Sequence, residues 1–195
     1  MLKPKTTDEL KALIKTFEDL NAIDTSLITN MGKMFYYERC FNQPLNNWDV
    51  SNVTDMHWMF YQAHSFNQPL NNWDVSKVTD MSQMFKDAES FNQPLNNWDV
   101  SNVIDMSCMF DGAKSFNQPL NKWDVSNVTA MVWMFKDADN YNQSMSNWRL
   151  SRKCDTYDFF TPSMMWFRYC DKDDMPLKGG KRMRILRNRF KDLWK

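Results

Sequence analysis

Apolar residues recur along the chain with a period of 25 residues. The sequence FNQPLNNWDVS is found at 41–51, 66–76 and 91–101, and as FNQPLNKWDVS at 116–126. Within one copy, Trp48 and Val50 alternate with polar neighbours, as in a short strand. The next apolar residues have the i, i+3, i+4, i+7 spacing of one helix face: Met56, Met59, Phe60 and Ala63. Each copy is therefore predicted to form a coil with a short strand and a short helix.

No single copy buries its own apolar face, whereas stacked copies bury a continuous core. Full copies span 41–65, 66–90, 91–115 and 116–140, and degenerate copies flank them on both sides. The fold class predicted is an α/β repeat solenoid of about six coils, over residues 23–165. Residues 1–22 are predicted to form an N-terminal capping helix, in which Thr7 is the cap and Thr54 and Asp55 cap the helix of one coil.

Residues dictated by the fold recur in every copy, so partner binding is expected where the copies differ. Aromatic side chains and one histidine occupy such variable positions, and Trp and Tyr are favoured interface anchors. The protein-binding candidates are Tyr36, Tyr37, His57, Trp58, Tyr61 and Trp133. The alternative is that these rings pack on neighbouring coils or on the N-terminal segment.

The end of the chain abandons the repeat and is strongly basic. The sequence has 24 basic and 24 acidic residues, but 178–195 carries eight Lys/Arg against one Asp. Residues 166–195 are predicted to form a C-terminal cap and a basic amphipathic helix. Its anion-binding candidates are Lys181, Arg182, Arg184, Arg187, Lys191 and Lys195. This helix is expected to dock on the protein itself or on a partner, with its cations solvated, and the alternative is contact with nucleic acid or an anionic membrane.

Nothing in the sequence predicts an enzyme, a cofactor, a metal site or a small-molecule substrate. The two histidines, His57 and His64, do not recur with the period, and the four cysteines form no C-x-x-C pair. The recurring aspartates Asp49, Asp74, Asp99 and Asp124 are predicted to tie turns rather than bind calcium, because the chain has only four glycines. The cysteines are predicted to be free thiols. The N-terminus lacks the apolar core of a secretory signal, which predicts an intracellular protein or one inside a virus particle.

The motif W-D-V-S-N-V-T-D-M-x-x-M-F at 48–60, followed by F-N-Q-P-L-N, resembles the repeat of BspA-like bacterial surface proteins, a 25- to 26-residue unit, over residues 24–148. The resemblance implies a leucine-rich-repeat-like solenoid with binding roles and no catalysis, as found on bacterial surfaces, in protists and in large DNA viruses. The missing signal peptide and wall anchor favour a viral or intracellular copy. The function predicted is a non-enzymatic protein-interaction scaffold or structural protein, with the virion as one setting. The alternative is a nucleic-acid or membrane adaptor acting through the basic helix.

Overall fold

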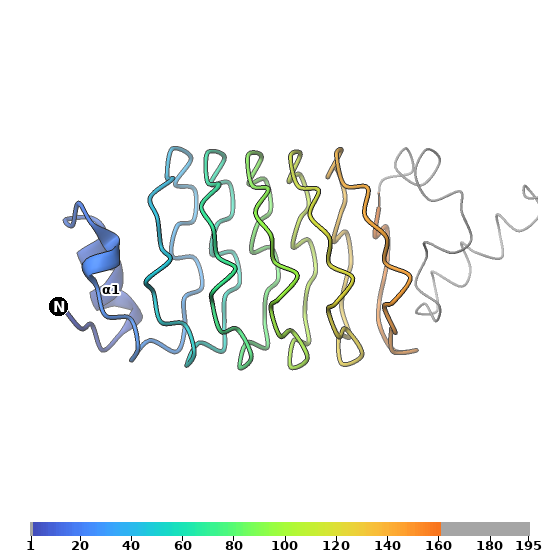
Figure 1. Cartoon of the computed structure of the whole chain (residues 1–195), viewed down its shortest axis with the longest axis horizontal. Coiled ribbons are helices and arrows are strands. Elements are labelled where there is room, and N and C mark those ends of the chain that lie inside the picture. The colour runs from blue at the N-terminus through green and yellow to red at the C-terminus, as the bar shows by residue number, and fades with distance from the viewer. Residues whose placement is uncertain (1, 161–195) are drawn as a thin grey trace, which may run out of the picture.

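The computed structural model describes residues 2–160, wound into successive coils that lie side by side in a row (Figure 1). Isolated parallel bridges join residues 25 positions apart: Asn30 to Asp55, Asp55 to Asp80, Asp80 to Asp105, Asp105 to Ala130 and Ala130 to Asp155. Equivalent positions of neighbouring copies therefore lie next to each other, in register, along the whole row. The predicted segment 166–195, with all six anion-binding candidates, lies outside the described residues.

The backbone of each coil divides its hydrogen bonds between two directions. In residues 56–62, the N–H groups of Met56, Trp58, Phe60 and Gln62 donate to carbonyls of the next coil, at 2.8–2.9 Å. The N–H groups of the intervening Met59 and Tyr61 donate to the carbonyl three residues back, at 3.2 Å. His57 completes the set, since its N–H donates to Asp55 Oδ1 at 2.9 Å. The backbone donors of the segment are thus satisfied without a helix.

The helix predicted for each copy is therefore wrong, and so is the short strand predicted at Trp48 and Val50. Within residues 2–160 the helical elements are α1 (Thr7–Ile14) and the 3-10 helix η1 (Leu20–Ala22), and this part of the chain has bridges but no extended strand. The backbone cannot continue a right-handed helix because two residues of each coil have the positive φ of the left-handed region. These residues are Lys33, Tyr37, Trp58, Gln62, Gln83, Asp87, Cys108, Gly112, Trp133, Asp137 and, in the last described coil, Asp158.

Aromatic rings fill the interior in columns that run from coil to coil. The rings of Phe60, Phe85 and Phe110 are stacked nearly parallel, with centroids 5.5 and 5.6 Å apart. A second column is formed by Phe41, Phe66, Phe91, Phe116 and Tyr141. Apolar burial, the largest favourable term in folding, is therefore shared between copies.

The tryptophan that recurs at one position of every copy also forms a hydrogen bond to the preceding coil. The indole Nε1 of Trp73, for example, donates to the carbonyl of Leu45 at 3.1 Å, and the ring is only 4% exposed. The same bond recurs at 2.8–2.9 Å for Trp48, Trp98, Trp123 and Trp148. A buried indole N–H needs such a partner. The recurring tryptophan therefore both fills the core and fixes the alignment of each coil with the preceding one.

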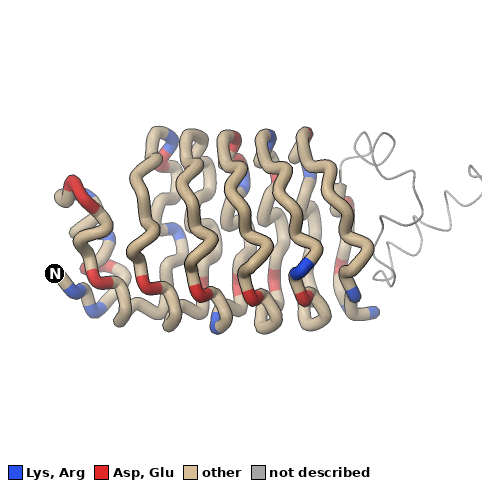
Figure 2. Tube along the Cα trace, in the orientation of Figure 1, with Lys and Arg blue, Asp and Glu red and all other residues tan. Residues whose placement is uncertain are grey.

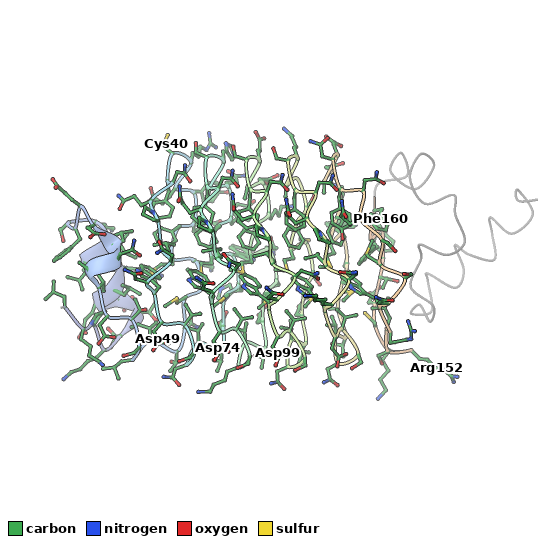
Figure 3. The ribbon with its side chains drawn as sticks, viewed as in Figure 1. Cys40, Asp49, Asp74, Asp99, Arg152 and Phe160 are labelled. Carbon is green, nitrogen blue, oxygen red and sulfur yellow. The ribbon has the colours of Figure 1, made fainter. Side chains whose placement is uncertain are left out.

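Polar columns shape the turns, as predicted for the recurring aspartates. Oδ1 of Asp49 accepts the backbone N–H of Ser51 at 3.0 Å, and the same bond recurs at Asp74, Asp99 and Asp124. Figure 2 shows an acidic position repeated along one edge of the coils, and Figure 3 labels three of these residues there. Hydrogen bonds from the side chain and backbone of Ser76 lower the pKa of Asp74. The confirmed role is a turn in which the aspartate side chain replaces a backbone acceptor.

The column of asparagines at the opposite corner of the repeat also joins the coils. Oδ1 of Asn67 accepts the backbone N–H of Asn92 at 2.9 Å and Nε2 of Gln93 at 3.0 Å. Asn42, Asn92 and Asn117 accept the same pair of donors from the coil that follows each of them. The recurring amides thus satisfy the bent backbone of the coil that follows each of them.

The first coil is covered by α1, in the place predicted for the N-terminal capping helix, although the helix is confined to Thr7–Ile14 rather than 1–22 (Figure 1). Leu10 is fully buried, and Leu13, Ile14 and Phe17 pack against the core. The cap is Thr6 rather than Thr7, since Thr6 Oγ1 accepts the N–H of Glu9 at 3.2 Å. Thr54 and Asp55, predicted as caps, instead bind the neighbouring coil and the N–H of His57.

Within residues 2–160, Cys40, Cys108 and Cys154 form no disulfide, as predicted, and they differ in accessibility. The fourth cysteine, Cys170, lies outside the described residues. Cys40 lies exposed on an outer turn (Figure 3), whereas burial raises the pKa of the Cys154 thiol to about 12. Because the thiolate is the reactive form, we expect iodoacetamide to alkylate Cys40 at least tenfold faster than Cys154 in the folded protein. Peptide mapping by mass spectrometry after timed quenching measures both rates. Equal rates in the native state, and not only in urea, would contradict the burial of Cys154.

Candidate functional site

Four aromatic side chains from the first two coils gather on one surface, and we refer to them as the aromatic cluster: Tyr36, Tyr37, Trp58 and Tyr61. Tyr36 is central, with its ring stacked on Trp58 at 5.4 Å and on Tyr61 at 5.1 Å. Tyr37 meets Tyr36 edge-on at 4.3 Å. The cluster exists because the 25-residue register places the pair after Phe35 beside the pair after Phe60.

The cluster combines exposed ring surface with polar groups. Tyr37 is 47% exposed, and Lys33 Nζ lies 4.7 Å from the centroid of the Trp58 ring, in a cation–π contact. The neighbouring rings desolvate the hydroxyl groups of Tyr36 and Tyr61, and this, together with hydrogen bonding to Tyr37, raises the pKa of both. The hydroxyl groups therefore keep their protons at neutral pH and can donate hydrogen bonds to a ligand.

Two of the six predicted residues stand apart from the cluster. Trp133 lies three copies further along, where it is 37% exposed and contacts Lys136 and Tyr157. His57 is next to Trp58, with ring centroids 6.2 Å apart, but its Nδ1 lies 2.6 Å from Asp55 Oδ1. The imidazole is thus held by a carboxylate of its own coil.

In the coils that follow the aromatic cluster, the positions equivalent to Tyr36 and Tyr61 are occupied by the charged residues Lys86 and Asp111. Lys86 Nζ donates to a carboxylate oxygen of Asp111, which is almost fully buried at 3% exposure. Burial raises the pKa of Asp111, although the ammonium of Lys86 opposes this. Burial, the largest single effect, lowers the pKa of Lys86, but the hydrogen bond to Asp111 and the charges of Asp111 and its neighbours together outweigh it, so the net pKa is raised. Lys86 and Asp111 thus form an ion pair next to the aromatic cluster, in which the two charges neutralise each other.

Sequence reasoning missed a cluster of possible metal ligands formed by Asp55, His57 and Asp80. One ligand atom from each of them lies within 4.8 Å of the other two. Two of the residues belong to one coil and the third to the next, brought together by the bridge between Asp55 and Asp80. The signal available in the sequence was that a histidine occurs only once at this register, beside an aspartate that recurs.

Stacked copies of one 25-residue unit, with an aromatic surface at the variable positions, define a repeat-containing protein. The chain belongs to the family described as Mycoplasma protein of unknown function, DUF285, whose model matches residues 7–106 and, in a second overlapping match, 71–166. No curated protein and no solved structure matches the chain significantly. Among the described residues, no helix combines the length and the apolar character needed to cross a membrane.

Proposed function

We propose that the protein is a non-enzymatic interaction scaffold, in which a leucine-rich-repeat-like solenoid presents the aromatic cluster to a protein partner. The bridges that join equivalent positions every 25 residues support the solenoid. The repeat motif supports a BspA-like type of unit, and origin in a large DNA virus remains a prediction. The observation that carries the functional proposal is the cluster itself, formed where the copies differ.

The surface has the properties of a binding hot spot. Tyrosine and tryptophan offer large contact areas at a small cost in side-chain entropy, and such anchors carry most of the binding energy of an interface. The rings already contact each other across two coils, at 5.1–5.6 Å. Packing on the neighbouring coil, the alternative expected from the sequence, accounts for part of their burial. Tyr37 nevertheless remains 47% exposed in the monomer.

The test is capture of partners by the full-length protein and by Trp58→Ala/Tyr61→Ala, compared by quantitative mass spectrometry. We expect the double variant to lose at least 90% of the captured partner, since removing two hot-spot residues costs about 4 kcal/mol or more. The matched control is Trp133→Ala, because Trp133 has the same register, a similar φ of 57° and a similar lysine contact. Equal capture by all three proteins would refute the proposal.

The alternative function is binding of nucleic acid or an anionic membrane through the basic end of the chain. A protein truncated after residue 177 distinguishes this function from binding through the aromatic cluster. If the truncation abolishes all capture while the aromatic variant retains it, the basic segment is the binding element. Electrostatic binding to phosphates also weakens steeply as salt rises, whereas contact with the aromatic cluster does not. A salt titration of the captured complex therefore distinguishes the two functions.

A further inference from the structure

We propose that Asp55, His57 and Asp80 form a binding site for one first-row divalent transition-metal ion of the Zn²⁺ class. The donors are one imidazole nitrogen and two carboxylate oxygens, whose ligand atoms all lie within 4.8 Å of one another. Ligands about 2.1 Å from a tetrahedral zinc ion lie about 3.4 Å apart. To surround an ion, the ligand atoms that are furthest apart must therefore approach one another by at most about 1.4 Å. This site is separate from the proposed scaffold function.

The three side chains are held in place by the coil structure. Asp55 Oδ2 accepts a hydrogen bond from Asn30 Nδ2 of the preceding coil at 2.9 Å, and its Oδ1 lies 2.6 Å from His57 Nδ1. Asp80 Oδ1 accepts the N–H of Ser82 at 2.8 Å, and among the described residues no donor binds its Oδ2. Hydrogen bonds from outside the ligand set orient metal ligands and raise affinity. Asn30 orients Asp55 in this way.

The histidine is the element that distinguishes this site from the rest of the column. The aspartate pair recurs one coil further on as Asp80 and Asp105, which are joined by the same parallel bridge, but Ser82 stands where His57 would be. Two carboxylates alone suit Ca²⁺ or Mg²⁺, whereas an added imidazole favours Zn²⁺, Co²⁺ or Ni²⁺. The next coil therefore serves as an internal control, because it has the two carboxylates of the proposed site but no imidazole nitrogen.

Gly32 makes room for the imidazole. A Cβ placed on Gly32 would lie 2.5 Å from His57 Cε1 and 2.6 Å from His57 Nδ1. The preceding coil therefore has no side chain where the ring lies. The side chains of His57 and Asp55 are 29% and 27% exposed, so an ion can enter from solvent and water can complete its coordination.

The test is titration of the full chain with ZnCl₂ by calorimetry, and with CoCl₂ by visible absorption. We expect one ion per chain, with affinity at least tenfold lower in His57→Ser and Asp80→Asn. Both substitutions suit the fold, because serine occupies the register of His57 in two other copies and asparagine keeps the Oδ1 acceptor of Asp80. The matched control is His64→Ser, which removes the only other histidine and should leave the affinity unchanged.

Gly32→Ala provides a variant that keeps all three ligands and displaces the ring, and it should also weaken binding at least tenfold. If His57→Ser fails to fold by circular dichroism, Asp80→Asn and Gly32→Ala decide the question. Equal affinity in these variants, an equal loss in His64→Ser, or no saturation below millimolar ion would overturn the proposal. A thiolate charge-transfer band in the Co²⁺ spectrum would do the same, because it would place the ion on a cysteine.

Discussion

Trp98→Ala is expected to lower the free energy of unfolding by about 3–5 kcal/mol. The Trp98 ring is only 3% exposed and packs beside Phe85, with centroids 6.4 Å apart. Its Nε1 donates to the carbonyl of Leu70 at 2.9 Å. The substitution therefore opens a cavity and leaves that carbonyl without its donor. Urea unfolding followed by far-UV circular dichroism measures the change.

Two control variants separate the contributions of packing and hydrogen bonding. Trp98→Phe keeps an aromatic ring but not the donor, and should cost about 1–3 kcal/mol for the unsatisfied carbonyl plus a smaller packing loss. Trp133→Ala removes a partly exposed indole of the variable register, and should cost at most about 0.5 kcal/mol. If Trp98→Ala were as mild as Trp133→Ala, the tryptophan column would not hold the coils together.

Deletion of residues 66–90, one whole copy, is expected to leave a folded protein with a lower unfolding midpoint. The new junction joins Ser65 to Phe91, which repeats the native order of Ser65 and Phe66. Each coil then meets a neighbour with equivalent contacts, because the stability of a repeat array is a sum over copies and their interfaces. Circular dichroism and size-exclusion chromatography should show a compact chain with a cooperative transition.

Deletion of residues 66–78, about half a copy, is the control, and it should abolish cooperative unfolding. The buried Phe, Trp and Met positions would then face polar positions of the adjacent coil, and the asparagine and aspartate columns would be broken at one step. A half-copy deletion as stable as the whole-copy deletion would show that the 25-residue register does not govern folding.

The sequence predicted the contacts between equivalent positions of neighbouring copies better than the backbone within each copy. The period places Asp55 next to Asp80, and asparagine at each corner, because identical side chains in register make identical contacts. The helix was inferred from the spacing of Met56, Met59, Phe60 and Ala63, and all four are indeed buried. Successive turns bring these residues to the interior just as a helix would. The left-handed φ of Trp58 has no signal in a sequence that lacks glycine at that position.

The candidate site was predicted in part for the same reason. Tyr36, Trp58 and Tyr61 come together because they are one period apart or close in a single coil. The proximity of His57 to Asp80 depends on side-chain direction and on the absence of a Cβ at Gly32. Neither follows from residue spacing alone. The basic segment has no periodic neighbour from which its position could be inferred.

The left-handed positions restrict the residues that can be accepted there during divergence. A β-branched residue is strongly disfavoured at positive φ, and proline is excluded from it. The residues found there in the described coils include lysine, tyrosine, tryptophan, glutamine, cysteine, aspartate and glycine, but not valine, isoleucine, threonine or proline. The backbone thus disfavours branching at Cβ, whereas residues that differ in charge, size and aromaticity occupy these positions. A lineage of such proteins can exchange one binding chemistry for another at these positions, one point mutation at a time, without redesigning the coil.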